Sequence, residues 1–259
     1  MIQDLFELST WTLAQRHKEL QEYQKSIDRE RYDDKLFESM HLETISKYKS
    51  SPHFQKWESP DKSSMLLLVG SNHEIVMESR HHCWISPLAL DLIDTFTANS
   101  RTHAFYAFKL SGRTGIHPAV SEILFQLLTW KRRELGSEAH FATLRAGLKD
   151  YRSINVKDDD AKLDALCHLA RSTMRLFRPD ETVYIVLDRI DRCEENDRID
   201  FLNALIDIME EAVGSVKIFA IANGTGWDVE ERDLKKTKRT HVKQVFEHQK
   251  LLFDGQNWA

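Results

Sequence analysis

The sequence predicts an α/β protein in which helices flank a parallel sheet and a helical segment precedes the sheet. Short apolar runs alternate with long helical patterns from residue 65 onward, and this alternation is typical of βαβ units. The run Val183–Leu187 holds five consecutive apolar residues and ends at an aspartate. Such a run fits a strand that is buried on both faces, as in the centre of a parallel sheet.

The composition favours a cytoplasmic protein with neither a membrane nor a clear nucleic-acid partner. A length of 259 residues with 41% apolar content suffices for one large α/β domain or for a domain with a helical appendage. The net charge of −5 provides no basic field for nucleic acid. The three cysteines are scattered, which suits a reducing compartment. The start lacks a secretory-signal pattern, and no apolar run approaches the ~20 residues of a membrane span.

Three segments are expected along the chain. Residues 1–52 carry imperfect apolar stripes at helical spacing and are predicted to form a helical N-terminal segment. Pro52 and Pro60 then interrupt helix, so the α/β domain is expected over residues 53–230. Residues 231–259 are predicted to form a C-terminal helical tail. Its basic run, residues 234–244, would be a solvated helix face or would contact phosphate or an acidic partner.

Within the α/β domain the expected elements alternate in order. The expected strands are Met65–Val69, His103–Leu110, Val183–Leu187 and Val216–Ala222. The first expected helix opens at Ser86 and Pro87, with serine as the N-cap and proline at the first helical position. The helices expected after it are Pro118–Leu135, Phe141–Tyr151, Ala161–Phe177 and Arg198–Val213. The crossovers between parallel strands are expected to be right-handed.

Small or polar residues end three of the predicted strands. The first strand ends at Gly70, the third at Asp188 and the fourth at Asn223. A second acid, Asp191, follows three positions after Asp188. Open α/β sheets bind their ligands outside the carboxyl ends of the strands, so these residues are candidates for a site. A core strand followed by a solvated acidic turn explains the two aspartates equally well.

Two stretches carry a family resemblance. The first is VYIVLDRIDRCE, residues 183–194, in which an apolar strand leads into two aspartates. The second is FQKWESPDKSSMLLLVG, residues 54–70, in which aromatic-x-x-Trp precedes a short apolar strand that ends in Gly. Together they resemble NACHT-type STAND P-loop NTPases, especially fungal ones, over about residues 55–225.

The resemblance implies both a strand order and a set of site residues. It implies that a strand ending at Asn223, the sensor position, is inserted between the strand of Gly70 and the strand of Asp188. It implies that Asp188 and the hydroxyl of Ser86 are Mg²⁺ ligands and that Asp191 is catalytic. The implied ligand is ATP or ADP with Mg²⁺.

The phosphate-binding loop departs from the pattern of that family. A working loop reads G-x-x-x-x-G-K-[ST], in which backbone amides cradle the phosphates and the lysine reaches the β/γ oxygens. Here Gly70, Ser71 and Asn72 begin a longer loop that has no second glycine and no lysine before Ser86. These residues are the candidate cofactor-binding residues, with Arg80 as a replacement charge. Ser86 is open to two interpretations, a metal ligand or a plain N-cap.

Two arginines accompany the two aspartates. Arg189 and Arg192 stand where the family usually has a small or acidic residue. Arg192 replaces the acid that would help to polarise a water. The arginines and aspartates could also neutralise each other in surface ion pairs. Both changes predict a loss of hydrolysis.

The long loop between Gly70 and Ile85 also holds residue types that bind zinc. These are His73, Glu74, Glu78, His81, His82 and Cys83. Their spacing matches no recognised ligand pair, and a solvated loop is the competing interpretation. Their bulk predicts that the loop either fills the space of a phosphate or is mobile, and an inward-packed loop would bury Trp84 near Asp188.

The functional prediction is a signalling scaffold or nucleotide-dependent switch with weak or no ATP hydrolysis. Its partner would be another protein or a second copy of the chain. ATP or ADP with Mg²⁺, and no cofactor at all, are equally compatible with the residues. Two alternatives remain open: an active ATP/GTP-binding NTPase, and an unrelated metal-dependent enzyme that uses Asp188 and Asp191.

Overall fold

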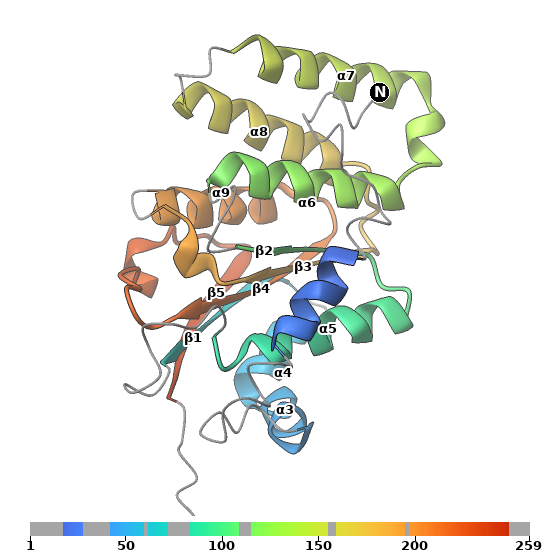
Figure 1. Cartoon of the computed structure of the whole chain (residues 1–259). Helices are drawn as coiled ribbons and strands as arrows, with labels where there is room; N and C mark the ends of the chain where they lie inside the picture. The colour runs from blue at the N-terminus through green and yellow to red at the C-terminus, as the bar shows by residue number, and fades with distance from the viewer. Residues whose placement is uncertain are drawn as a thin grey trace, which may run out of the picture.

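Five parallel strands form one sheet in the computed structural model, and helices cover both faces of this sheet (Figure 1). The structure describes residues 18–27, 42–59, 62–71, 83–108, 115–154, 159–194 and 197–248. The strands are β1 (Ser63–Ser71), β2 (His103–Ala107), β3 (Thr182–Asp188), β4 (Ser215–Asn223) and β5 (Thr240–His248). Across the sheet their order is β2-β3-β4-β1-β5. The expected fold class, a P-loop NTPase-like parallel sheet flanked by helices, is confirmed.

Strand β4 lies between β1 and β3, and this brings three strand tips together. The register pairs Gly70 of β1 with Asn223 of β4. Asp188 is the last residue of β3, and the preceding Leu187 is paired with Ala220 of β4. The expected insertion of a strand is therefore confirmed, and Gly70, Asp188 and Asn223 share the carboxyl edge of the sheet.

The helices divide into two layers (Figure 1). The layer on one face consists of α3 (Leu42–Lys49), α4 (Pro52–Glu58) and α5 (Ser86–Ala98). The layer on the other face consists of α6 (Ile116–Trp130), α7 (Glu138–Ser153), α8 (Asp159–Met174) and α9 (Arg198–Glu211). Within this second layer α7 lies farthest from the sheet (Figure 1). None of the helices in the described ranges is long and apolar enough to cross a membrane.

Alternate residues of β1 face the two helical layers. Met65, Leu67 and Val69 belong to the core cluster under α6, α8 and α9. Leu66 and Leu68 belong to the core cluster under α4 and α5. Successive side chains of a strand point to opposite faces, so a strand covered on both faces needs apolar residues at every position. This is why the strand reads as a continuous apolar run.

Helix α4 anchors the chain just before β1. Phe54 and Trp57 lie three positions apart, on one face of the helix, and are 3% and 2% exposed. The indole nitrogen of Trp57 donates to the carbonyl oxygen of Ile218 in β4, at 2.8 Å. The hydroxyl of Ser64 in β1 donates to the carbonyl of Trp57, also at 2.8 Å. The aromatic-x-x-Trp pattern thus ties this helix to the sheet.

The expected helical tail over 231–259 is wrong for the part that the structure describes. A short 3₁₀ helix, η5 (Glu231–Asp233), is followed by strand β5, which pairs with β1. Val242 packs against one core cluster and Val245 against the other, so this segment covers both faces as a strand does. Pairing with β5 also satisfies the outer backbone groups of β1. Residues 249–259 lie outside the described residues.

Helices also occur in the described parts of the expected N-terminal segment. Residues 18–27 are helical, and α3 and the start of α4 follow. In the second layer α6 ends at Trp130 rather than at the expected Leu135, and a 3₁₀ helix, η2 (Glu134–Gly136), comes next. Between them the chain turns and the ammonium of Lys131 binds the carboxylate of Glu181 at 2.7 Å.

Candidate functional site

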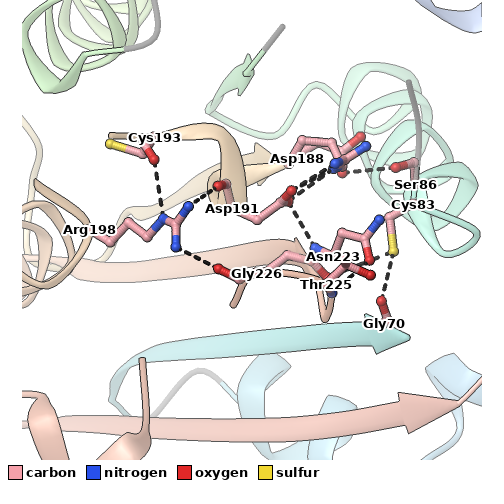
Figure 2. A network of polar contacts seen from close by, with 12 residues as sticks. Gly70, Cys83, Ser86, Asp188, Asp191, Cys193, Arg198, Asn223, Thr225 and Gly226 are labelled. Carbon is pink, nitrogen blue, oxygen red and sulfur yellow. Dashed lines mark hydrogen bonds and ion pairs between the residues drawn. The ribbon is translucent and has the colours of Figure 1, made fainter. Parts of the chain in front are cut away.

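The Asp188 carboxylate lies fully buried at the tip of β3 and accepts two hydrogen bonds. Its Oδ1 accepts a hydrogen bond from the hydroxyl of Ser86, at 3.0 Å (Figure 2). Its Oδ2 accepts a hydrogen bond from the hydroxyl of Tyr23, which lies in the helix over 18–27. The structure therefore brings Asp188 and Ser86 together, as the resemblance implied, and adds a tyrosine from the N-terminal segment.

Ser86 is not the N-cap of α5, so that interpretation is wrong. The N-cap is Ile85, whose side chain makes no capping bond, and Ser86 is the first residue of the helix. The hydroxyl of Ser86 is fully buried and is directed to Asp188. A hydrogen bond to a carboxylate is stronger than a hydrogen bond between neutral groups. The Ser86 hydroxyl therefore donates to Asp188 instead of accepting from a backbone N–H at the start of the helix.

Asp191 and Arg189 form a buried ion pair next to Asp188. The Arg189 guanidinium donates to both carboxylate oxygens of Asp191, at 2.9 Å through Nε and 2.7 Å through Nη2. The backbone N–H of Asn223 donates to the same carboxylate at 2.8 Å. Both charged side chains are 6% exposed, so the expected surface pairing of arginine and aspartate is wrong here. Arg189 has a left-handed backbone (φ 59°, ψ 44°), which is uncommon outside glycine, and the chain turns there into η3 (Ile190–Arg192).

Burial governs the charges of this cluster. Burial raises the pKa of the Asp188 carboxyl above its ordinary value, although hydrogen bonds from Tyr23 and Ser86 oppose this effect. Burial, together with the neighbouring Asp188, raises the pKa of the Tyr23 phenol as well. Burial and the nearby Arg189 lower the pKa of Arg192 to about 10. The cluster thus combines a carboxyl group of raised pKa, Asp188, with the two arginines Arg189 and Arg192.

The tip of β1 is packed against side chains rather than open to a phosphate. The thiol of Cys83 lies 3.5 Å from the carbonyl oxygen of Gly70 and 3.7 Å from that of Ala222 (Figure 2). A Cβ atom placed on Gly70 would lie 2.7 Å from Cys83 Sγ and 2.8 Å from Ile85 Cδ1. Cys83 and Ile85 are fully buried, and Trp84 between them is 9% exposed. The end of the long loop therefore packs inward.

Of the remaining candidate residues, Ser71 and Asn223 are described by the structure and the others are not. Ser71 lies against Gly224, where an added Cβ would come within 2.5 Å of the serine hydroxyl. The side-chain oxygen of Asn223 accepts from the backbone of Thr225 at 3.1 Å, so the amide turns back onto its own loop. Asn72 and Arg80 lie outside the described residues, as do His73, Glu74, Glu78, His81 and His82.

The sequence reasoning missed Arg198, which joins the two loops at the carboxyl edge (Figure 2). Its guanidinium donates to the carbonyl oxygens of Asp191, Cys193 and Gly226, at 2.5, 3.1 and 2.7 Å. It also pairs with Asp228 at 2.8 Å. A signal was present, because a cation in the first turn of a helix opposes the helix dipole and needs another reason to be there.

These residues do not fit a magnesium–nucleotide complex in the arrangement observed. Every carboxylate oxygen of Asp188 and Asp191 accepts a hydrogen bond from a protein group, whereas Mg²⁺ needs open oxygens. Cys83 and Ile85 fill the space beside Gly70 where a phosphate loop would curl. Among the described residues, no group of three or more His, Cys, Asp or Glu is placed to hold a metal ion.

Comparison with known proteins gives one match to a family. No curated protein matches the chain significantly. The family model described as "Nephrocystin 3, N-terminal" matches residues 85–222, which is more than half of the 259 residues. The matched range begins next to Ser86, contains Asp188 and Asp191, and ends one residue before Asn223. The name of this family is not NACHT or STAND, so that finer resemblance stays a prediction. The chain belongs to the nephrocystin 3 N-terminal family.

Proposed function

We propose that the chain is a degenerate P-loop domain that serves as a signalling scaffold. In the arrangement observed, with the space beside Gly70 filled by side chains, it does not hydrolyse nucleotide. The observation that carries this proposal is that groups of the protein itself donate hydrogen bonds to the carboxylates of Asp188 and Asp191. Ser86 and Tyr23 bind Asp188, while Arg189 and the backbone of Asn223 bind Asp191. A site that stabilises itself in this way has little free energy to gain from a cation.

Two further observations support the loss of hydrolysis. Cys83 packs on Gly70, so the backbone there cannot form the amide nest that holds a phosphate. Arg192 stands where a carboxylate would orient the attacking water, and an arginine cannot act as a general base at neutral pH. The fold is thereby reused as a rigid body whose surfaces bind a protein partner or a second copy of the chain. A reducing compartment such as the cytoplasm suits its three unbridged cysteines.

A nucleotide-dependent switch is the second candidate, and one observation favours it. The hydroxyl of Ser86 and the carboxylate of Asp188 stay 3.0 Å apart at the edge of the sheet. In P-loop NTPases a hydroxyl and a carboxylate placed like this hold Mg²⁺. In this candidate the domain would bind ATP or ADP weakly after its site opens, and nucleotide would bias one conformation over another.

Calorimetry separates the two candidates. The chain would be titrated with ATP, ADP and GTP, each with Mg²⁺, and phosphate release would be followed in parallel. The scaffold predicts no saturable heat and a background rate of phosphate release, equal in the wild type and in Asp188→Ala. Robust turnover that disappears in Asp188→Ala would refute the proposal and establish an active NTPase.

A further inference from the structure

Helix α7 carries an open hollow along one flank. In its layer α7 lies farthest from the sheet (Figure 1). Its inner residues Leu144, Leu148 and Tyr151 are buried in the core cluster. A Cβ atom added to Gly147 would lie 2.9 Å from Cδ2 of Leu169, so α7 packs closely on α8. The α7 hollow is lined by six residues of this helix: Glu138, Phe141, Ala142, Arg145, Ala146 and Lys149.

The charged groups of the α7 hollow are exposed and unpaired within the described part of the chain. No described residue forms an ion pair with Glu138, Arg145 or Lys149. Phe141 is only half-buried, and Ala142 beside it is exposed. The hollow thus presents an aromatic ring together with charges of both signs on a firmly packed helix.

The lining residues are complementary to one another about the midpoint of the hollow, which falls between positions 143 and 144. Residues at equal distances from this midpoint form three couples: Glu138 with Lys149, Phe141 with Ala146, and Ala142 with Arg145. One couple joins opposite charges, and the other two each join a large side chain to a small one. Glu138 and Lys149 are about three helical turns apart, so they lie on the same face at opposite ends of the hollow.

We infer that the α7 hollow is the surface through which a second copy of the chain binds, as an antiparallel pair of α7 helices. A twofold axis at the midpoint reverses the direction of the helix, so each residue comes level with the other member of its couple. Glu138 then lies level with Lys149 of the second copy, and this ion pair occurs at both ends of the contact. The inference rests on the proposed function, because it assigns a surface to the self-association of the scaffold.

The order of the charges selects this orientation. A parallel pair of α7 helices would bring Glu138 level with Glu138 and Lys149 level with Lys149, and like charges at close range repel. In the antiparallel pair Phe141 lies level with Ala146 of the second copy, so a small residue leaves room for the ring. A single pair of helices is a small contact, and the dimer should therefore dissociate on dilution.

Sedimentation equilibrium of the full chain without nucleotide measures the dissociation constant of this dimer. Glu138→Lys and Lys149→Glu each place like charges against each other at both ends, and each should raise the constant about tenfold. The double variant restores opposite charges in exchanged order and should return to within about threefold of the wild type. Asp150→Lys is the matched control, because Asp150 is exposed on the same helix but lies outside the hollow. It should leave the constant unchanged.

A mixture of the two single variants tests the pairing of residues directly. In a mixed dimer of Glu138→Lys with Lys149→Glu, the new lysine meets the new glutamate at one end. At the other end the native Lys149 of one chain meets the native Glu138 of the other. The mixture should therefore associate about as tightly as the wild type, although each variant alone associates weakly.

Three outcomes would overturn the inference. They are a wild type that stays monomeric at every concentration, a dimer that neither charge reversal weakens, and a mixture of the single variants that associates no better than each alone. Far-UV circular dichroism of each variant shows that its helices stay folded. Because association is measured without nucleotide, its failure is distinguishable from failure of the proposed function, which appears as Asp188-dependent turnover by the wild type.

Discussion

Arg189 and Asp191 form a bidentate ion pair that is buried between the ends of β3 and β4, with each side chain 6% exposed. The two residues are two positions apart. Arg189 has a left-handed backbone, and the 3₁₀ helix η3, which contains Asp191, begins at the next residue. By contrast the carboxylate of the adjacent Asp188 is fully buried and accepts from the hydroxyls of Tyr23 and Ser86. The two aspartates therefore differ in their hydrogen-bond donors, a guanidinium for Asp191 and two hydroxyls for Asp188.

Asparagine substitutions should separate these environments. Asp191→Asn leaves the buried guanidinium of Arg189 without its counter-charge, and it should lower the free energy of unfolding by about 3 kcal/mol. Asp188→Asn removes a buried charge while keeping the shape of the side chain, so stability at neutral pH should be unchanged or higher. Urea unfolding of both variants measures the difference. Equal losses in the two variants would contradict the distinction.

The pH dependence of Asp188→Asn follows from the direction of the pKa shift. An acid whose pKa is raised by folding stabilises the fold when it is protonated, and this contribution is lost as the pH rises through the pKa of the folded state. The stability of the variant relative to the wild type should therefore grow as the pH rises from about 3.8, the ordinary pKa, toward neutrality. Thermal melts of both proteins across this range test the sign, and a relative stability that falls with pH would refute it.

Gly70→Ala should destabilise the fold, because the new Cβ meets Cys83 and Ile85 at less than 3 Å. Both neighbours are buried and cannot move freely, so a loss of about 2 kcal/mol is expected. Adding Cys83→Ala should recover part of it, and a double-mutant cycle in urea measures the coupling. Gly136→Ala is the control, since an added Cβ there meets nothing within 4 Å. Strict additivity of the two substitutions would contradict the close packing.

Arg198→Met should loosen the two loops that follow β3 and β4. It retains most of the side-chain length but removes the donors to Asp191, Cys193 and Gly226. Three carbonyl oxygens then lose a charged donor, and the expected loss of stability is about 3 kcal/mol. Amide exchange over residues 189–194 and 224–228 should rise. Arg232→Met removes an exposed pair with Glu230 and should change stability by less than about 0.5 kcal/mol.

The cysteines should be unreactive in the native protein. All three are buried and unbridged. Burial raises the pKa of Cys83 and of Cys193 to about 12, and it also raises that of Cys167. The thiolate is the reactive form, so near pH 8 a disulfide reagent such as DTNB should label none of them before denaturation and all of them after it. Rapid labelling of one native thiol would contradict this placement.

Much of the fold could be predicted from local sequence patterns. The apolar run before Asp188 and the alternation of strands with helices predicted the parallel sheet, whereas the inserted strand was implied by the family resemblance. These features repeat over a few residues, and burial on both faces imposes them on each strand separately. β5 escaped prediction because Thr240–His248 holds only three apolar residues, Val242, Val245 and Phe246, without the continuous apolar run of the other strands, and because its partner β1 lies far away in the chain.

The positions of some residues of the candidate site could be predicted, but their contacts could not. The sequence by itself placed Asp188 and Asn223 at one edge of the sheet and put Ser86 at the start of a helix. Only the tertiary structure decided what those groups bind, because Tyr23 reaches Asp188 across 165 positions and no spacing in the sequence encodes such a contact. The closed arrangement likewise depends on Cys83 packing on Gly70, and side-chain packing is a property of the assembled core.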